Sequence, residues 1–129
     1  MIYENNNIIP AIRIAFECGI HTFQNESSTG KSWLAEQLQI LHRMGEPVMS
    51  ITYNDVLDGV IERKLEIAKE CKIIMFDRYD MYNGEYLEEM KLLAKNAMLL
   101  VDCKYGIVHL LEELSCEIQC SKDLIEVVL

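Results

Sequence analysis

Residues 72–77 read KIIMFD and residues 97–102 read AMLLVD, so each stretch is a continuous apolar run of strand length that ends in an aspartate. An apolar run without polar alternation is typical of a strand buried on both faces, as in a parallel sheet covered by helices. The two stretches therefore predict two buried strands, each of which delivers an acid, Asp77 or Asp102, at its carboxyl end.

The sequence around these runs alternates between helical periodicity and further β-rich stretches. Helices are predicted over 31–44, 55–71, 84–96 and 107–114, and strands over 8–16, 19–24, 47–53, 116–120 and 124–129. Asp55 is the expected N-cap of its helix, and the break at Cys18-Gly19 favours a hairpin between the first two strands. Because strands that alternate with helices imply right-handed crossovers, we expect an α/β fold. Its sheet should be mainly parallel with helices on both faces, and its outer strands can form an antiparallel edge.

Length and composition set the class of protein. A chain of 129 residues, 50% of them hydrophobic, predicts a single domain spanning 1–129. The net charge of −9 argues against nucleic acid as a partner, because phosphate contacts normally need a basic surface. No apolar run reaches the roughly 20 residues of a membrane span. We therefore expect no membrane partner and a cytoplasmic location, where the five cysteines would be free thiols.

The stretch with the clearest chemistry is residues 25–32, NESSTGKS, between a predicted strand and a strongly predicted helix. Such a loop can direct backbone N–H groups toward an anion at the positive end of the helix dipole. Gly30 would keep a Cβ away from the phosphates, Lys31 would reach the β- and γ-phosphates, and the Ser32 hydroxyl would ligate magnesium. The alternative is a solvated turn that caps the helix.

This stretch resembles the GxxxxGK[ST] motif of the P-loop NTPases, and KIIMFD resembles their hhhhD motif. The resemblance implies a three-layer fold of the additional-strand class, which includes the recombinase-like and AAA ATPases, with a strand order of about 5-1-4-3-2. It also implies binding of ATP with Mg²⁺, in which Ser32 and Asp77 hold the metal. The implied nucleotide-binding residues are Asn25, Glu26, Ser27, Ser28, Thr29, Gly30, Lys31, Ser32 and Trp33.

Three residues depart from the family pattern. Asn25 replaces the first glycine, Glu26 adds a negative charge, and Arg78 stands where this class normally has a catalytic glutamate. The expected activity is therefore nucleotide binding with weak or partner-dependent hydrolysis. The general base stays open, with Asp80, Glu85 or Asp102 as the alternatives.

Two other functions fit the same residues. A degenerate relative of the family could act as a protein-interaction or regulatory module without turnover. Asp77-Arg78-Tyr79 also resembles a motif of the thymidylate kinases, in which the arginine contacts substrate phosphate, although no arginine follows Arg78 to form a lid. Because many P-loop ATPases place their site between subunits, the resemblance also implies a protein partner or a homo-oligomer. Lys104 is a candidate sensor of the γ-phosphate.

Overall fold

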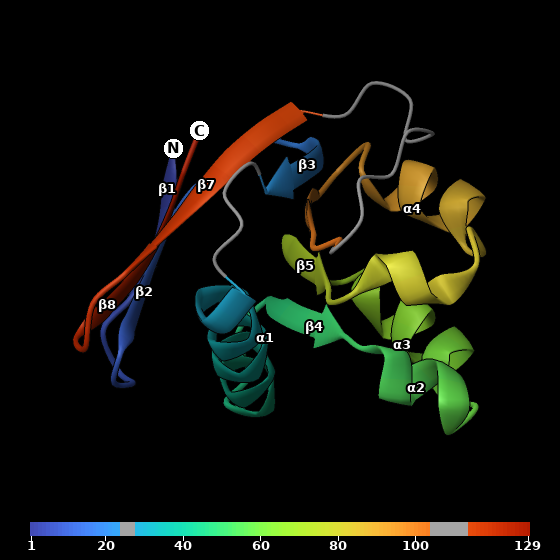
Figure 1. The fold of residues 1–129 in the computed structure, drawn as a ribbon, viewed down its shortest axis with the longest axis horizontal. Helices are drawn as coiled ribbons and strands as arrows, with labels where there is room; N and C mark the ends of the chain where they lie inside the picture. The colour runs from blue at the N-terminus through green and yellow to red at the C-terminus, as the bar shows by residue number, and fades with distance from the viewer. Residues whose placement is uncertain (24–27, 104–113) are drawn as a thin grey trace.

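The computed structural model describes residues 1–23, 28–103 and 114–129, without the side chains of Ser28 and Thr29. Within these ranges the chain forms one sheet and several helices (Figure 1). The strands are β1 (Ile2–Asn5), β2 (Ala11–Ala15), β3 (Gly19–Phe23), β4 (Val48–Ile51), β5 (Ile73–Phe76), β6 (Met98–Val101), β7 (Leu114–Cys120) and β8 (Leu124–Val128). The helices are α1 (Ser28–Arg43), α2 (Tyr53–Leu57), α3 (Ile61–Ala68), α4 (Leu87–Leu93) and the 3₁₀ helix η1 (Tyr79–Tyr82).

The sheet has eight strands in the order β1-β2-β8-β7-β3-β6-β5-β4 and is mixed. The successive pairs β7–β3, β3–β6, β6–β5 and β5–β4 are parallel. The β1–β2 and β7–β8 pairs are antiparallel, and β2 pairs with β8 in parallel. One end of the sheet, from β7 to β4, is therefore parallel, whereas the other end, from β1 to β7, is mixed.

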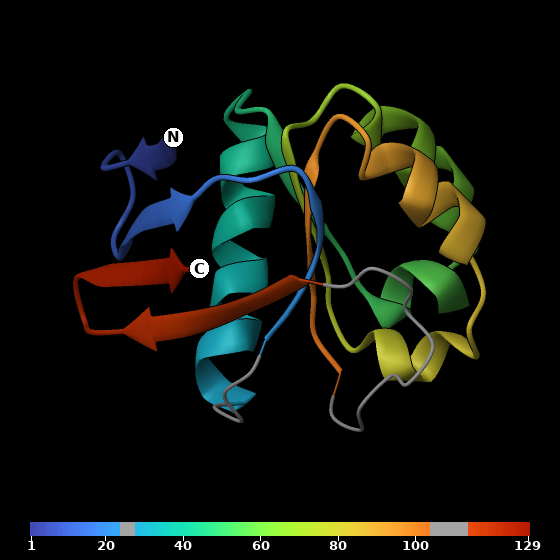
Figure 2. The same cartoon turned by 90° about the horizontal axis from the view of Figure 1, so that it is seen from above.

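The sheet curls into a half-barrel because β7 changes partners along its length. Its first residues, Leu114–Cys116, pair with β3, and Glu117–Cys120 pair with β8. The strands beyond β7 bend away and wrap over α1, which lies between them and the parallel strands in Figure 2. Strand twist favours this coiling of a large sheet.

The prediction of a mainly parallel three-layer sheet with helices on both faces and the order 5-1-4-3-2 is wrong. The sheet is mixed, has eight strands and encloses α1 within its curl instead of stacking flat between two helical layers. The predicted hairpin is also wrong, since β2 pairs with β1 and β8, whereas β3 pairs with β6 and β7. The hairpin was predicted because its two strands are adjacent in the sequence. That argument does not predict the additional strand β1, nor the pairing of β2 and β3 with distant strands.

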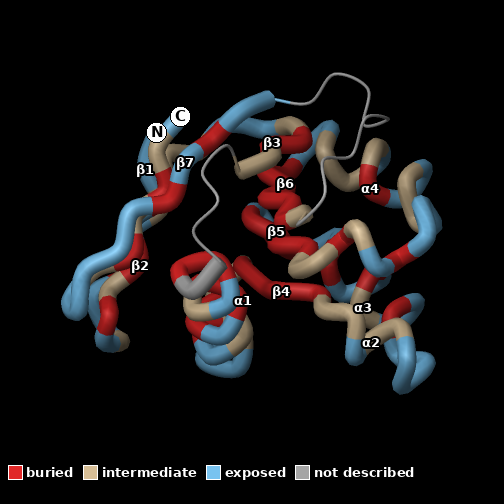
Figure 3. The backbone as a smooth tube through the Cα atoms, viewed as in Figure 1, coloured by how far each residue is buried: buried red, intermediate tan, exposed pale blue. Residues whose placement is uncertain are grey.

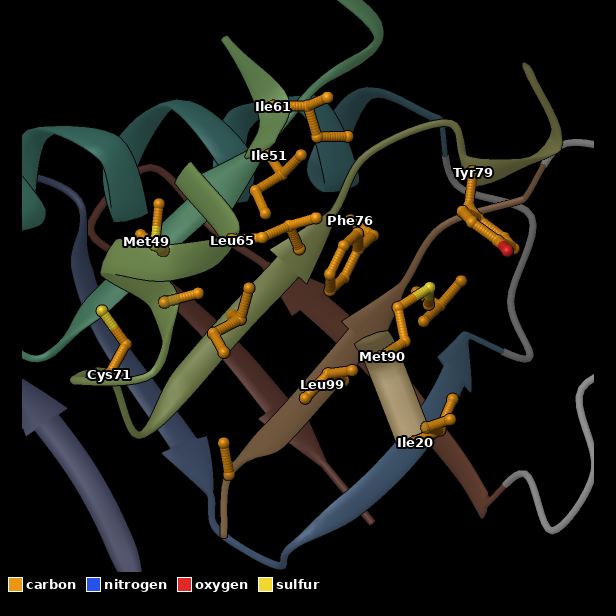
Figure 4. Close-up of a cluster of buried hydrophobic side chains, with 14 of the residues drawn as sticks. Ile20, Met49, Ile51, Ile61, Leu65, Cys71, Phe76, Tyr79, Met90 and Leu99 are labelled. Atoms are coloured by element: carbon orange, nitrogen blue, oxygen red, sulfur yellow. The ribbon is translucent and has the colours of Figure 1, made fainter. Parts of the chain in front are cut away.

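Two cores fix the arrangement. One lies between α1 and the curled sheet, and its buried α1 members are Leu34, Ala35, Leu38 and Leu41. The other lies on the opposite face of the parallel strands, where Phe76 of β5 and Leu99 of β6 pack with Met90 of α4 (Figure 4). All residues of β4, β5 and β6 are buried, as Figure 3 shows. The two buried strands predicted from KIIMFD and AMLLVD are confirmed.

The helices differ from the prediction at glycines and caps. The predicted helix over 55–71 is divided into α2 and α3, because Gly59 between them has a positive φ of 70°. Asp55 lies in the first turn of α2, where its carboxylate accepts a 2.8 Å hydrogen bond from the N–H of the N-cap residue, Thr52. The predicted helix over 107–114 lies outside the described residues apart from Leu114, which begins β7.

Candidate functional site

The carboxyl ends of β3, β5 and β6 meet at one edge of the sheet, because these strands are parallel neighbours. Phe23 ends β3, Asp77 follows β5 and Asp102 follows β6. Lys31 lies in the first turn of α1, which begins after the segment that follows β3. Ligands of open α/β sheets bind at such carboxyl edges, so this edge is the candidate site.

Lys31 is buried within this edge, with 6% of its surface exposed. Its Nζ lies 3.5 Å from Asp102 Oδ1 and 5.6 Å from the centre of the Phe23 ring. A buried ammonium group needs a counter-charge, and a nearby aromatic face adds a smaller attraction. The ion pair with Asp102 therefore holds Lys31 at the centre of the site.

The main chain fixes Asp102 in turn. Its N–H donates to the carbonyl oxygen of Phe76 at 3.0 Å, and its own carbonyl oxygen accepts from the N–H of Tyr79 at 2.8 Å. Both bonds join β6 to the end of β5. The aspartate predicted only as the end of a buried strand is thereby brought against Lys31.

Asp77 is the second carboxylate of the site. Its Oδ1 is buried and has no hydrogen-bond partner among the described residues. Burial raises the pKa of Asp77 to about 6, helped by a hydrogen bond to the Asp102 carboxyl and by repulsion from its charge, whereas Arg78 acts in the opposite direction. Two carboxyl groups can bond in this way only when one of them carries a proton. The two carboxylates therefore repel each other whenever both are charged.

Ser32 is exposed and lines the same open groove as Asp77. The groove has a volume of about 870 Å³ and runs between α1, the ends of β4 and β5, and α2. Other side chains on its wall include Gln39, Ser50, Thr52 and Arg78. The hydroxyl and the carboxylate predicted as metal ligands thus line one open space.

The residues present fit a magnesium ion bound together with phosphate. Mg²⁺ usually takes one or two protein oxygens and completes its shell with water and substrate phosphates. The unpartnered Oδ1 of Asp77 and the Ser32 hydroxyl supply such oxygens. In the part of the chain that the structure describes, no group of three or more His, Cys, Asp or Glu residues could hold a metal by itself.

Arg78 lies on the wall of the groove, but its guanidinium is paired with a carboxylate. Its main chain is left-handed, with φ of 52°, and its guanidinium binds Asp80 through two hydrogen bonds of 3.1 and 3.0 Å. Asp80 is therefore engaged with Arg78, and Glu85 is exposed. Of the three alternatives for the general base, Asp102 is the one beside Lys31. In the kinase alternative, Arg78 would bind substrate phosphate, but its guanidinium is already paired with Asp80.

The structure covers only part of the predicted phosphate loop. Asn25, Glu26 and Ser27, the side chains of Ser28 and Thr29, and the candidate sensor Lys104 lie outside the described residues. Gly30 is buried in the first turn of α1, and Trp33 packs against the core around this helix. The described part of the motif that meets the site is Gly30 to Ser32.

Sequence reasoning missed the contribution of Tyr82. It is buried, and its hydroxyl lies 3.0 Å from the carbonyl oxygen of Asp77 and 3.1 Å from that of Ile51. Its ring packs edge-on against Tyr79 at 5.2 Å. Tyr79, Tyr82 and Tyr86 lie close together in the sequence, but nothing there indicates that one hydroxyl anchors Asp77, the predicted metal ligand.

Comparison of the chain with protein-family models, with curated proteins and with solved structures finds no match in any of the three. In the described part of the chain, no helix has both the length and the apolar character needed to cross a membrane. The function must therefore be argued from the site itself.

Proposed function

We propose that this protein binds a nucleoside triphosphate, ATP by the resemblance of its motifs, together with Mg²⁺ at the amino end of α1. The observation that supports this most strongly is the Lys31–Asp102 ion pair at the sheet edge where Asp77 also lies, since a buried oxygen of Asp77 has no partner among the described residues. That combination provides a cation for phosphate and an oxygen ligand for a metal. Without a ligand, the buried oxygen of Asp77 is costly.

The amino end of α1 would bind the phosphates. This helix is 16 residues long and carries no acidic residue in its first turn, so its dipole favours an anion there. Lys31 adds a full positive charge at the same end. Residues 25–32 form the proposed phosphate loop, by the resemblance of their sequence.

Ser32 and Asp77 would hold the magnesium. When bound, Mg²⁺ neutralises charge on the phosphate oxygens. The Tyr82 hydroxyl bonds the main chain of Asp77, which keeps that carboxylate at the edge of the groove. The role of these residues is therefore to place a fixed oxygen opposite the phosphates.

Hydrolysis would be weak in the isolated chain. A water must be oriented toward the γ-phosphate, and an arginine that is permanently charged cannot accept its proton. Arg78 is such a residue, and Asp102 is already engaged with Lys31. A protein partner or a second copy of the chain would then have to supply the missing group. None of the five cysteines forms a disulfide within the described residues, which fits the proposed cytoplasmic location.

The second candidate is a protein-interaction or regulatory module without turnover. The observation that favours it is the Lys31–Asp102 pair itself, because the lysine charge is already satisfied without any phosphate. In that case the remnants of the motif would serve only to stabilise the fold.

Calorimetric titration with ATP and MgCl₂ separates the two candidates. We expect the wild type to bind and Lys31→Met to lose at least about a hundredfold in affinity, since a buried charge-assisted contact is removed. Lys69→Met is the matched control, because Lys69 is exposed, its ion pair among the described residues is with Glu66 on α3, and its loss changes the net charge equally. A wild type that fails to bind at millimolar nucleotide would favour the interaction module.

A further inference from the structure

The Lys31–Asp102 pair has a consequence for how strongly the site can bind an anion. The two side chains are 8% and 9% exposed, and the pair is 3.5 Å long. Among the described residues, taking the Asp102 carboxylate away would leave the buried Lys31 ammonium with the Phe23 ring, which is a weak substitute for a charge. The free protein is therefore stabilised with its phosphate-binding lysine already occupied.

Asp102 is also held firmly in place. Its main-chain N–H and carbonyl oxygen are both bonded, to Phe76 and Tyr79. A carboxylate on such an anchored backbone stays at the site when a ligand arrives. The lysine side chain, with its long flexible stem, is the member of the pair that can turn away.

We infer that Asp102 is an internal competitor for the phosphate ligand and sets the affinity of the site by occupying the Lys31 ammonium. This inference rests on the proposed function. Carboxylate and phosphate oxygens are anionic acceptors that compete for the same ammonium N–H donors. A phosphate group can gain the full charge of Lys31 only by drawing it away from Asp102.

Asp77 makes this exchange depend on a cation. It lies against Asp102, and its Oδ1 has no partner among the described residues. Once Lys31 turns toward a phosphate, two carboxylates and the phosphate face one another in a partly buried site. A divalent cation relieves that repulsion. Asp102 therefore couples phosphate binding to the presence of the metal.

The experiment titrates inorganic tripolyphosphate into the wild type and Asp102→Asn, with and without MgCl₂, at fixed ionic strength. Asn keeps the shape of the side chain and one acceptor oxygen, but it removes the charge and replaces the other oxygen with an NH₂ donor. We expect Asp102→Asn to bind at least about tenfold more tightly than the wild type without Mg²⁺, since one charge-assisted contact no longer has to be displaced. Asp123→Asn, an exposed residue between β7 and β8, changes the net charge equally and should bind like the wild type.

The outcomes separate this inference from the proposed function. A wild type that binds while Asp102→Asn binds equally or more weakly overturns the competitor role and leaves the proposed function standing. Absence of binding by both proteins overturns both. If circular dichroism shows that Asp102→Asn is unfolded, the inference is tested on the wild type by NMR instead. Tripolyphosphate with Mg²⁺ should then shift the carboxyl ¹³C signal of Asp102 but not that of Asp123, and an unmoved Asp102 signal overturns the inference.

Discussion

The hydroxyl group of Tyr82 lies 3.0 Å from the main-chain carbonyl oxygen of Asp77, and 3.1 Å from that of Ile51. Its single proton is shared between the ends of two neighbouring strands, β4 and β5. Tyr82 is buried, and its bond to Ile51 lies away from bulk water, whereas its bond to Asp77 is partly buried. Tyr82 thereby joins the core under α2 to the residue proposed as the metal ligand.

Replacing Tyr82 with Phe should destabilise the fold by about 1–3 kcal/mol, because a buried carbonyl oxygen loses its hydrogen-bond donor. Urea unfolding followed by circular dichroism measures this. Tyr53→Phe is the control, since the Tyr53 ring lies 6.3 Å from that of Tyr82 but its hydroxyl has no hydrogen bond within the described residues. An equal loss in both variants would contradict the bridging role.

Chelation of Mg²⁺ should weaken ATP binding by about tenfold or more, because the phosphates would then face Asp77 and Asp102 unneutralised. Asp77→Asn should reduce this difference between samples with and without metal. Calorimetry with EDTA or MgCl₂ measures both effects, and melting temperature without nucleotide serves as the control. ATP binding of equal strength with and without metal would remove Asp77 from the metal site.

The stability of the protein without metal should depend on Asp77 between pH 4 and 7. The pKa of Asp77 rises from 3.8 to about 6 on folding, so the folded state binds the proton more tightly than the unfolded state. Asp77 therefore lowers the free energy of unfolding least at acid pH. The destabilisation grows as the pH rises through this interval and the carboxyl group loses its proton.

Asp77→Asn removes that titration, so its advantage over the wild type should increase from pH 4 to pH 7. The gain should be on the order of 1 kcal/mol after allowance for solvent screening in a partly exposed group. Urea unfolding at pH 4, 5, 6 and 7 measures the difference. The other charged groups at this edge of the sheet are Lys31, Arg78, Asp80 and Asp102. Asp123→Asn, which removes an exposed carboxylate, provides the control. A constant difference across the series would contradict the raised pKa.

ATP hydrolysis by the wild type alone should be well below about 1 s⁻¹, the low end of typical enzymes. Arg78 cannot activate water, and its guanidinium is engaged with Asp80. Phosphate release under saturating MgATP measures the rate, with Lys31→Met as the control for contaminating ATPase. Rapid turnover that Lys31→Met abolishes would contradict this expectation and direct the search for the base to Asp102.

The strands that deliver the acids could be predicted from the sequence. KIIMFD and AMLLVD contain the uninterrupted apolar runs IIMF and AMLLV, which at this length are typical of a strand buried on both faces. The helix after Gly30-Lys31-Ser32 was equally clear, since its leucines recur with helical spacing, and it became α1. These features depend on residues close together in the chain, which is why sequence patterns carry them.

The curl of the sheet, and with it the failure of the three-layer prediction, was decided by tertiary structure. The partner change along β7 and the parallel pairing of β2 with β8 join segments from opposite ends of the chain. No local sequence pattern specifies which distant strand pairs with β2 or β7. The break between α2 and α3 was readable in principle from Gly59, but the strong apolar stripe on both sides concealed it.

The same division holds at the site. By itself, the sequence determined the residue types: a lysine and a serine that open a helix, and an acid that ends each of two buried strands. Only the tertiary structure decided that Asp102 would neutralise Lys31 and crowd Asp77. The physical reason is that charges interact through space. The parallel packing of β3, β6 and β5 brings together carboxylates and an ammonium group that the chain keeps far apart.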